Sequence, residues 1–297
     1  NLDQDTSGFI QGYKAYEDED RKKENPNPDA YRDAKSVHLQ SNISREIGEG
    51  SRLTFTPYWR DNEMEFLQHF LPWQSVEENG HQSFGFNTKW YLEKEWFQLT
   101  SGIDLEYTDG WLKEEQDEPF SPNQPAGTHY DYDVEASMAS IWSQLNWDAS
   151  DRLNVSAGLR YEYTNYDYTN NTDDGPACSP SATACRFYRP GDREDDFSNW
   201  SINVGGLYDL NDAHAVYLRA SRGFRAPQTT ELYRLQAGQE VADLDSEGLN
   251  SIDLGFRGIV GEFHYEIGSY YMEKEDVIFQ DSNRQNVSGA STLHYGI

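Results

Sequence analysis

The residue types that perform catalysis are present in this chain, but they are not grouped into a recognisable catalytic motif. The sequence contains neither the G-x-S-x-G pattern of a nucleophile elbow nor the H-E-x-x-H pattern of a zinc hydrolase. Asp and Glu number 52 in 297 residues, so no carboxylate pair stands out as a general acid and base. The seven histidines stand singly, at His38, His69, His81, His129, His214, His264 and His294. These patterns favour a protein that is not an enzyme and indicate no resident cofactor or metal.

The two cysteines are the pair whose spacing predicts a covalent link. Cys178 and Cys185 lie seven residues apart in a segment rich in Ser, Pro and Asp. Close cysteines in such a loop favour a local disulfide, which implies an oxidising compartment such as the periplasm or the cell exterior. A metal site is the alternative, but it needs further ligands, and this loop contains no histidine.

The clearest structural signal is an alternation of apolar and polar residues from Arg152 to Thr164. A period of two predicts a β-strand with unlike faces. Strands of soluble sandwiches are usually about five or six residues long, whereas strands that cross an outer membrane need about nine to eleven. The length favours a transmembrane barrel. The face turned to lipid would carry Leu153, Val155, Ala157, Leu159, Tyr161 and Tyr163.

Similar stretches recur along the chain and predict about twelve antiparallel strands. The expected ranges are 7–16, 34–46, 51–61, 82–92, 96–107, 130–147, 152–168, 198–209, 214–222, 248–257, 262–273 and 288–297. Short connections at 47–50, 93–95, 148–151, 210–213 and 258–261 are rich in turn formers or charge and are expected at a periplasmic rim. The connections at 17–33, 62–81, 108–129, 169–197, 223–247 and 274–287 are long. Strict alternation of short and long connections is typical of an outer-membrane barrel with extracellular loops.

Composition agrees with a barrel and excludes other classes. Mean hydropathy is -0.88 and the longest strictly apolar run is Ala215 to Leu218, so no transmembrane helix is expected. Aromatic residues make up 14% of the chain, and many fall near predicted strand ends, where rings favour the membrane interface. The net charge of -28 offers no basic footprint for nucleic acid.

One segment carries a recognisable motif. The sequence from His214 to Gly238, HAVYLRASRGFRAPQTTELYRLQAG, resembles the S-x-G-F-R-A-P-x-x-x-E-L-Y signature of TonB-dependent outer-membrane receptors. The signature residues include Arg225, Pro227 and Glu231, for which we expect a structural role at the strand exit. Pro stops ladder pairing where the chain leaves the barrel, and Arg holds loop carbonyls or carboxylates. The resemblance is specific over roughly residues 153–297 and only architectural before them.

The resemblance implies a 22-stranded barrel plugged by an N-terminal domain and energised by the TonB complex. Neither the plug nor the closing C-terminal strands are expected within residues 1–297, which would form a partial barrel domain of a longer polypeptide in the outer membrane, in contact with lipid and lipopolysaccharide. The implied function is active transport of a ferric siderophore or a similar scarce solute. A passive porin or structural barrel, and a soluble extracellular β-rich binding protein, are the alternatives.

Ligand recognition would fall to aromatic and cationic side chains of the long connections. Aromatic faces hold rings, and Arg neutralises an anionic complex. The candidate ligand-binding residues are Trp73, Trp111, Tyr130, Tyr132, Tyr188, Arg189, Tyr233 and Arg234. Interface packing or loop packing is the alternative for each, and the sequence does not identify the solute.

Overall fold

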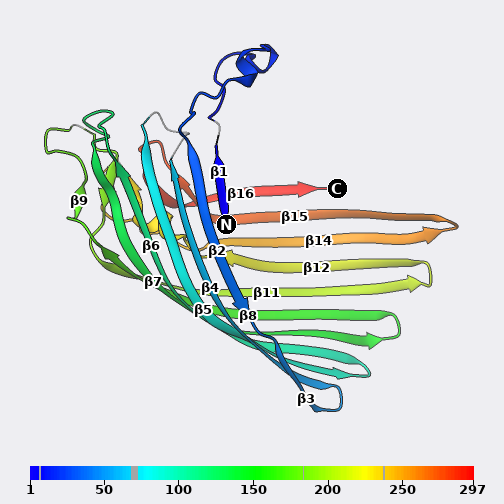
Figure 1. Ribbon diagram of the computed structural model, residues 1–297. Coiled ribbons are helices and arrows are strands. Elements are labelled where there is room, and N and C mark those ends of the chain that lie inside the picture. Colours follow the sequence, from blue (N-terminus) through cyan, green and yellow to red (C-terminus); the bar gives the residue numbers. More distant parts are fainter. Residues whose placement is uncertain (7, 68–72, 183, 237) are drawn as a thin grey trace.

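Most of the described part of the chain forms a curved, antiparallel sheet of thirteen strands (Figure 1). The computed structural model describes residues 1–6, 8–67, 73–182, 184–236 and 238–297. Neighbours in the sheet follow the chain in the order β1-β2-β4-β5-β6-β7-β8-β11-β12-β14-β15-β16, and β3 also pairs with β4. The strands are β1 (Leu2–Asp5), β2 (Tyr31–Gln40), β3 (Ile43–Gly48), β4 (Ser51–Leu67), β5 (Ser75–Lys94), β6 (Phe97–Gln116), β7 (Gly127–Ser150), β8 (Leu153–Asn170), β11 (Arg193–Asn211), β12 (His214–Arg225), β14 (Glu247–Val260), β15 (Phe263–Gln280) and β16 (Asn286–Gly296).

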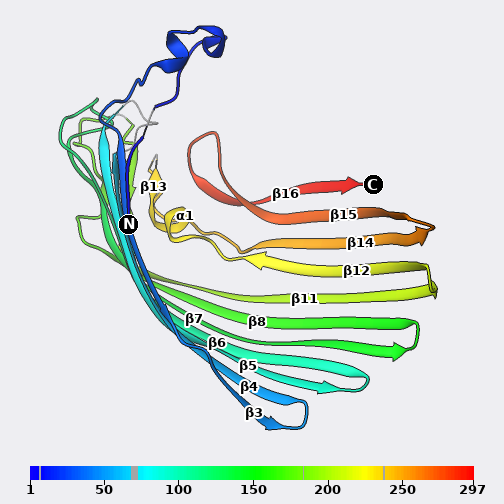
Figure 2. The ribbon, with the colours of Figure 1, turned by 45° about the vertical axis from the view of Figure 1, so that its right-hand side comes forward.

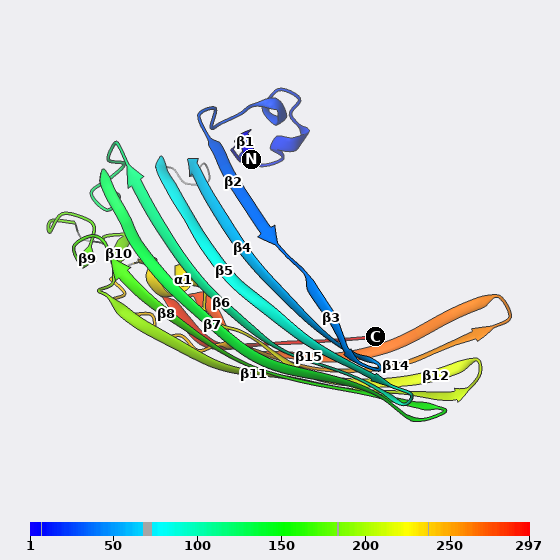
Figure 3. The ribbon, with the colours of Figure 1, turned by 60° about the horizontal axis from the view of Figure 1, so that its bottom comes forward.

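The sheet is open in the part of the chain that the structure describes. Its edge strands β1 and β16 do not pair with each other there. Figure 3 shows the strands side by side as a curved wall, with β2 and β4 toward one side and β14 and β15 toward the other. The all-β, antiparallel architecture predicted from the alternation is confirmed. Among the described residues, no helix is both long and apolar enough to cross a membrane.

The expected strands lie within observed strands, to within a residue at their ends, except the first two. The strand expected at 34–46 is divided into β2 and β3, because residues 41–42 belong to neither. A strand at 7–16 is wrong: residues 8–14 form loop and turn, Ala15–Glu17 is a 3-10 helix, and residue 7 lies outside the described residues. Gly12 has φ 125°, a conformation that breaks a regular ladder, and Arg21 Nη2 donates a hydrogen bond to the Gln11 carbonyl within this loop. The edge strand is instead β1, which pairs with β2.

The two rims of the sheet differ as predicted. After the first connection, which is longer than expected, the long connections are shorter than expected. At one rim, β4, β6, β8, β12 and β15 follow two-residue turns, such as Glu49–Gly50 and Gly261–Glu262. Gly50 and Gly261 adopt the positive φ that such turns require. We call this end the short-turn rim and the opposite end the long-loop rim. At the long-loop rim the strands continue well into the segments expected as loops, for example to Gln116 in β6.

Successive residues of each strand point to opposite sides of the wall. Arg160 Nη1 of β8 donates to Asp104 Oδ2 of β6 at 2.8 Å, and Arg60 Nη2 of β4 donates to Glu106 Oε1 at 2.7 Å, all on the concave face. The convex face carries the apolar residues of the same strands. Figure 2 shows helix α1 (Thr229–Tyr233) and β13 (Leu235–Gln236) on the concave side. The wall therefore has a polar inner face and an apolar outer face.

The outer face is exposed and apolar over the half of the wall nearest the short-turn rim. Ile202 and Val204 of β11, Leu218 of β12 and Ile252 of β14 are each about half exposed. Trp200 and Tyr208 bracket this stretch on β11, about 26 Å apart along the strand at about 3.3 Å per residue. This matches the roughly 25 Å apolar band of outer-membrane barrels, with aromatic rings at both of its edges. In the described part of the chain no second sheet covers this face, so the soluble alternative lacks the packing it requires.

A small second sheet folds against the inner face at the long-loop rim. It contains β9 (Gly175–Pro176), β10 (Phe187–Arg189) and β13, in the order β13-β10-β9. These strands and α1 belong to two long connections that are far apart in sequence. They enclose the main hydrophobic cluster, which contains Leu112, Tyr130, Tyr132, Val134, Tyr168, Phe187, Leu232, Tyr233, Leu235, Ala242 and Leu244.

Candidate ligand-binding region at the long-loop rim

Four tyrosines join the two long connections to the wall. Tyr130 and Tyr132 extend from β7, Tyr168 from β8, and Tyr233 from α1. The Tyr233 ring stacks on Tyr168 at 4.3 Å, and its hydroxyl donates to Asp195 Oδ2 at 2.8 Å. The Tyr130 hydroxyl donates to the Leu235 carbonyl at 2.6 Å. Burial raises the pKa of Tyr130 and of Tyr233, so these two hydroxyls act as neutral hydrogen-bond donors that hold the loops.

Arg234 occupies the centre of a buried charge cluster. Its Nη1 lies 2.7 Å from Glu77 Oε2 of β5, and its Nη2 pairs with Glu114 of β6. Both carboxylates are more than nine-tenths buried. Burial opposes the charge of Arg234, but the charges of Glu114 and Glu77 outweigh it and raise the pKa of Arg234. The guanidinium therefore ties the α1 segment to β5 and β6.

His129 extends this cluster toward the second sheet. Its Nδ1 lies 3.0 Å from Glu114 Oε1, its Nε2 lies 2.8 Å from the Pro125 carbonyl, and its ring stacks on Phe187 at 3.7 Å. The imidazole thus bridges a carboxylate of β6 and a backbone carbonyl that precedes β7. Burial opposes ionisation of Glu114, but the His129 hydrogen bond and the Arg234 charge outweigh it and lower the pKa of this carboxyl.

The signature residues form a second ion-pair cluster at the exit of β12. Arg225 donates through Nη1 and Nη2 to both carboxylate oxygens of Glu231, at 2.8 and 3.0 Å, and through Nε to Glu247 at 2.6 Å. Glu231 also accepts from the Gln228 backbone N–H at 2.7 Å and caps α1. Pro227 is fully buried where the chain leaves the sheet. Arg225 and Glu231 are thus in direct contact at the strand exit, and a structural role for Arg225, Pro227 and Glu231 stays a prediction.

The remaining sequence candidates do not gather in one place. Trp111 lies opposite Gly80 in the β5–β6 register, on the outer face of the wall, and is 38% exposed. Trp73 is buried, and the Arg186 guanidinium lies over its ring at 4.6 Å. Tyr188 and Arg189 belong to β10, and Arg189 Nε is buried without a hydrogen-bond partner among the described residues. Of these four, Tyr188 lines a cavity beside β10 and β13, and Trp111 lines two other cavities.

The predicted disulfide is present. Cys178 and Cys185 are bonded and close the loop that leads into β10. The described residues contain no group of three or more His, Cys, Asp or Glu side chains placed to bind a metal ion.

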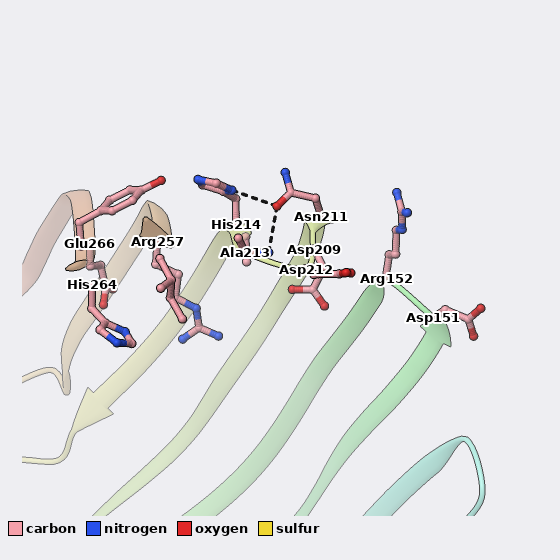
Figure 4. Close-up of a pocket in the computed structure, with 14 residues that line it drawn as sticks. Asp151, Arg152, Asp209, Asn211, Asp212, Ala213, His214, Arg257, His264 and Glu266 are labelled. Atoms are coloured by element: carbon pink, nitrogen blue, oxygen red, sulfur yellow. Dashed lines mark hydrogen bonds between the residues drawn. The ribbon is translucent and has the colours of Figure 1, made fainter. Parts of the chain in front are cut away.

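A cavity of about 750 Å³ lies instead at the short-turn rim (Figure 4). It is lined by the turns at Asp151–Arg152 and Asp212–Ala213 and by the neighbouring residues Arg257 and His264. In Figure 4 the Arg152 side chain points up from its turn, whereas the Arg257 and His264 side chains point down. These groups do not converge on one point, so this hollow lacks the arrangement that recognises a small molecule.

Sequence reasoning missed several charged residues at the long-loop rim. Glu77, Glu114 and His129 stand in segments that it assigned to loops, and Arg186 and Arg284 carry no motif. Glu114 lies in the part of β6 beyond the membrane band, where alternation of polar and apolar residues no longer distinguishes a lipid-facing side from an inner side. A useful signal would have been carboxylates at inner-face positions beyond the length needed to span the membrane.

Comparisons with known proteins agree with this geometry. A family model described as TonB dependent receptor-like, beta-barrel, matches residues 1–297. The Rhizobactin receptor of Rhizobium meliloti (strain 1021) is 24% identical over 155 residues, which is 46% of this chain and 20% of that protein.

Two solved structures share the fold. The copper transporter OprC matches with a TM-score of 0.68 and 13% identity, over 90% of this chain and 43% of that one. The ferric-catecholate import receptor Fiu from K12 E. coli matches with a TM-score of 0.61 and 11% identity, over 90% of this chain and 44% of that one. The chain therefore spans less than half the length of these relatives. The family match over its full printed length shows that this chain belongs to the β-barrel family of TonB-dependent receptors.

Proposed function

We propose that the receptor containing this chain imports a ferric siderophore or a similar scarce metal chelate across the bacterial outer membrane, with energy supplied through TonB. The family match supports transport by a barrel, and the relatives are named for rhizobactin, copper and ferric catecholate. Residues 1–297 would form part of a barrel wall, since they match 43% and 44% of two solved receptors. A plug domain would then supply the contact with TonB.

The observation that carries this proposal is the folded rim on the inner face. A passive pore needs only an open lumen, whereas here two long connections pack into a hydrophobic cluster and are joined to the wall by Arg225 and Arg234. Such a rigid rim suits capture of a dilute ligand, because little ordering entropy is lost on binding. The buried Tyr130, Tyr132 and Tyr233 would hold this rim, and Tyr188 would face the ligand.

The direct test is uptake of radioactive iron chelates by cells that depend on this receptor. We expect uptake to require both the receptor gene and TonB, and to stop when an uncoupler removes the proton gradient. Uptake that persists without TonB, together with steady ion conductance of the purified receptor in planar bilayers, would contradict active transport and favour the porin alternative.

A further inference from the structure

A second cavity at the long-loop rim differs from the rest of this acidic protein in the sign of its charge. Its volume is about 550 Å³, within the range of small-molecule sites. Arg186, which precedes β10, and Arg284, in the β15–β16 connection, both line it. None of its lining side chains, among the residues that the structure describes, is a carboxylate. Two guanidinium groups therefore share one cavity in a chain with a net charge of -28.

Asp281, the acidic residue nearest to Arg284 in sequence, accepts hydrogen bonds within its own turn. Asp281 Oδ1 accepts hydrogen bonds from the backbone N–H groups of Asn283 and Gln285, at 2.8 and 2.9 Å. Arg284 itself has φ 64°, an unusual conformation for a residue other than glycine. The turn thus presents the Arg284 side chain while its carboxylate is held by backbone donors.

Arg186 packs against an aromatic ring, and no carboxylate among the described residues forms an ion pair with it. Its guanidinium lies over Trp73 at 4.6 Å, and its backbone N–H donates to the Asn123 carbonyl at 3.2 Å. Burial lowers the pKa of Arg186, and the positive charge of Arg284 lowers it further. The two cations therefore repel each other across the cavity, and an anion between them would remove that repulsion.

The cavity is held in shape by links on both sides. The Cys178–Cys185 disulfide closes the loop that ends at Arg186. On the other side, Gln239 Nε2 donates to the Asn286 carbonyl and the Asn286 backbone N–H donates to Gln239 Oε1, both at 2.8 Å. These bonds join the β13 segment to the connection that carries Arg284, so the two arginines are positioned before any ligand arrives.

We propose that this cavity, the Arg186–Arg284 pocket, binds an oligocarboxylate anion, either free or as a metal chelate. Guanidinium groups match carboxylates through two parallel hydrogen bonds. Gln236 also lines the cavity, and its side-chain oxygen is buried without a hydrogen-bond partner among the described residues. Rotation of the Gln236 amide by 180° places its NH2 group at the position of this oxygen, and the NH2 group can then donate a hydrogen bond to the anion. Tyr188 supplies an aromatic wall. Only the step from binding to import rests on the function proposed above.

The test is calorimetric titration of the full receptor in detergent with citrate and with ferric citrate. Arg186→Gln and Arg284→Asn each remove one charge, and Asn tolerates the positive φ at position 284. We expect each to weaken binding about tenfold or more, as for loss of a charge-assisted hydrogen bond, and the double variant to abolish it. Arg152→Gln at the short-turn rim is the matched control and should bind as the wild type does. Unchanged binding in both pocket variants, or equal binding of inorganic phosphate, would overturn the assignment.

Uptake measurements separate this proposal from the proposed function. Citrate binding that depends on both arginines, without TonB-dependent import of ferric citrate, would leave the pocket standing and count against transport of that chelate. Import of a neutral ferric trihydroxamate at the same rate by the wild type and both variants, without citrate binding, would leave transport standing and overturn the pocket.

Discussion

Each strand of the wall runs through two environments. The half near the short-turn rim and the half at the long-loop rim are therefore stabilised by different interactions. Near the short-turn rim, apolar residues such as Leu218 face outward and polar residues such as Arg160 face inward. At the long-loop rim the inner face is the covered one, and it buries tyrosines together with Glu114 and Glu77. The first half follows a simple alternation dictated by lipid. The second half depends on specific contacts with loops far away in sequence, so single substitutions should act differently in the two halves.

The largest effect is expected from Arg234→Met at the long-loop rim. This variant leaves the buried Glu77 and Glu114 carboxylates without their guanidinium, which should lower the free energy of unfolding by about 3–5 kcal/mol. Denaturant titration in detergent measures it. Arg219→Met, at an exposed inner position of β12, is the control and should change stability by less than about 0.5 kcal/mol. Equal effects of the two variants would show that the buried cluster does not stabilise the rim.

The second-largest effect is expected in the half of the wall that faces lipid. Leu218→Arg places a charge inside the apolar band, opposite Gly206 of β11, and should lower stability by about 2 kcal/mol in bilayers. Gln144→Arg, at an exposed inner-face position of β7, should have little effect, because that face is polar. Folding equilibria in liposomes measure both. A similar loss from both substitutions would mean that the faces are wrongly assigned.

A pH dependence is expected from Glu247. Hydrogen bonding by Arg225, followed by contacts with Lys274 and the Ile278 backbone, outweighs burial and lowers the pKa of Glu247 from 4.5 to about 2. The folded state therefore gains stability above pH 4.5 and loses it as the pH falls toward 2. We expect the difference in unfolding free energy between wild type and Glu247→Gln to shrink by about 2 kcal/mol across this window. A constant difference would show that the carboxylate is not ionised in the Arg225 cluster.

The smallest effect distinguishes two tyrosines of the same cluster. Tyr233→Phe loses the hydrogen bond to Asp195 and should cost about 1.5 kcal/mol. Tyr132→Phe removes a buried hydroxyl that has no partner among the described residues, so stability should stay the same or rise. Thermal unfolding of the two variants in detergent provides the comparison. The reverse order would contradict the hydrogen-bond assignments at the rim.

The sequence predicted the wall well because lipid imposes a local rule. The alternation from Leu153 to Tyr163 requires only neighbouring residues, and the structure places it in β8 as expected. The strand expected at 7–16 was wrong because Gly12 and the following turns interrupt the pattern. Beyond the membrane band the alternation no longer reports lipid, so the sequence could not show that β6 continues to Gln116.

The candidate site could be predicted only in part, because its contacts join distant segments. The signature identified Arg225 and Glu231 together, since they lie six residues apart and share one bidentate ion pair. Tyr233 and Tyr168 stack although they belong to different connections. Trp111 and Tyr130 carry similar sequence signals, yet one lies on the outer face and the other is buried inside. The strand register decides which face of the wall each of these side chains occupies.

The account depends most on the claim that the outer face near the short-turn rim meets lipid while the long-loop rim does not. Single cysteines at residues 200–205 of β11 and 109–114 of β6, each carrying a spin label, would measure access to oxygen and to a water-soluble relaxation agent in bilayers. We predict oxygen access with a period of two, highest at 200, 202 and 204, and no such alternation at 109–114. Uniform access to the water-soluble agent across residues 200–205 would contradict the assignment of this wall to a membrane.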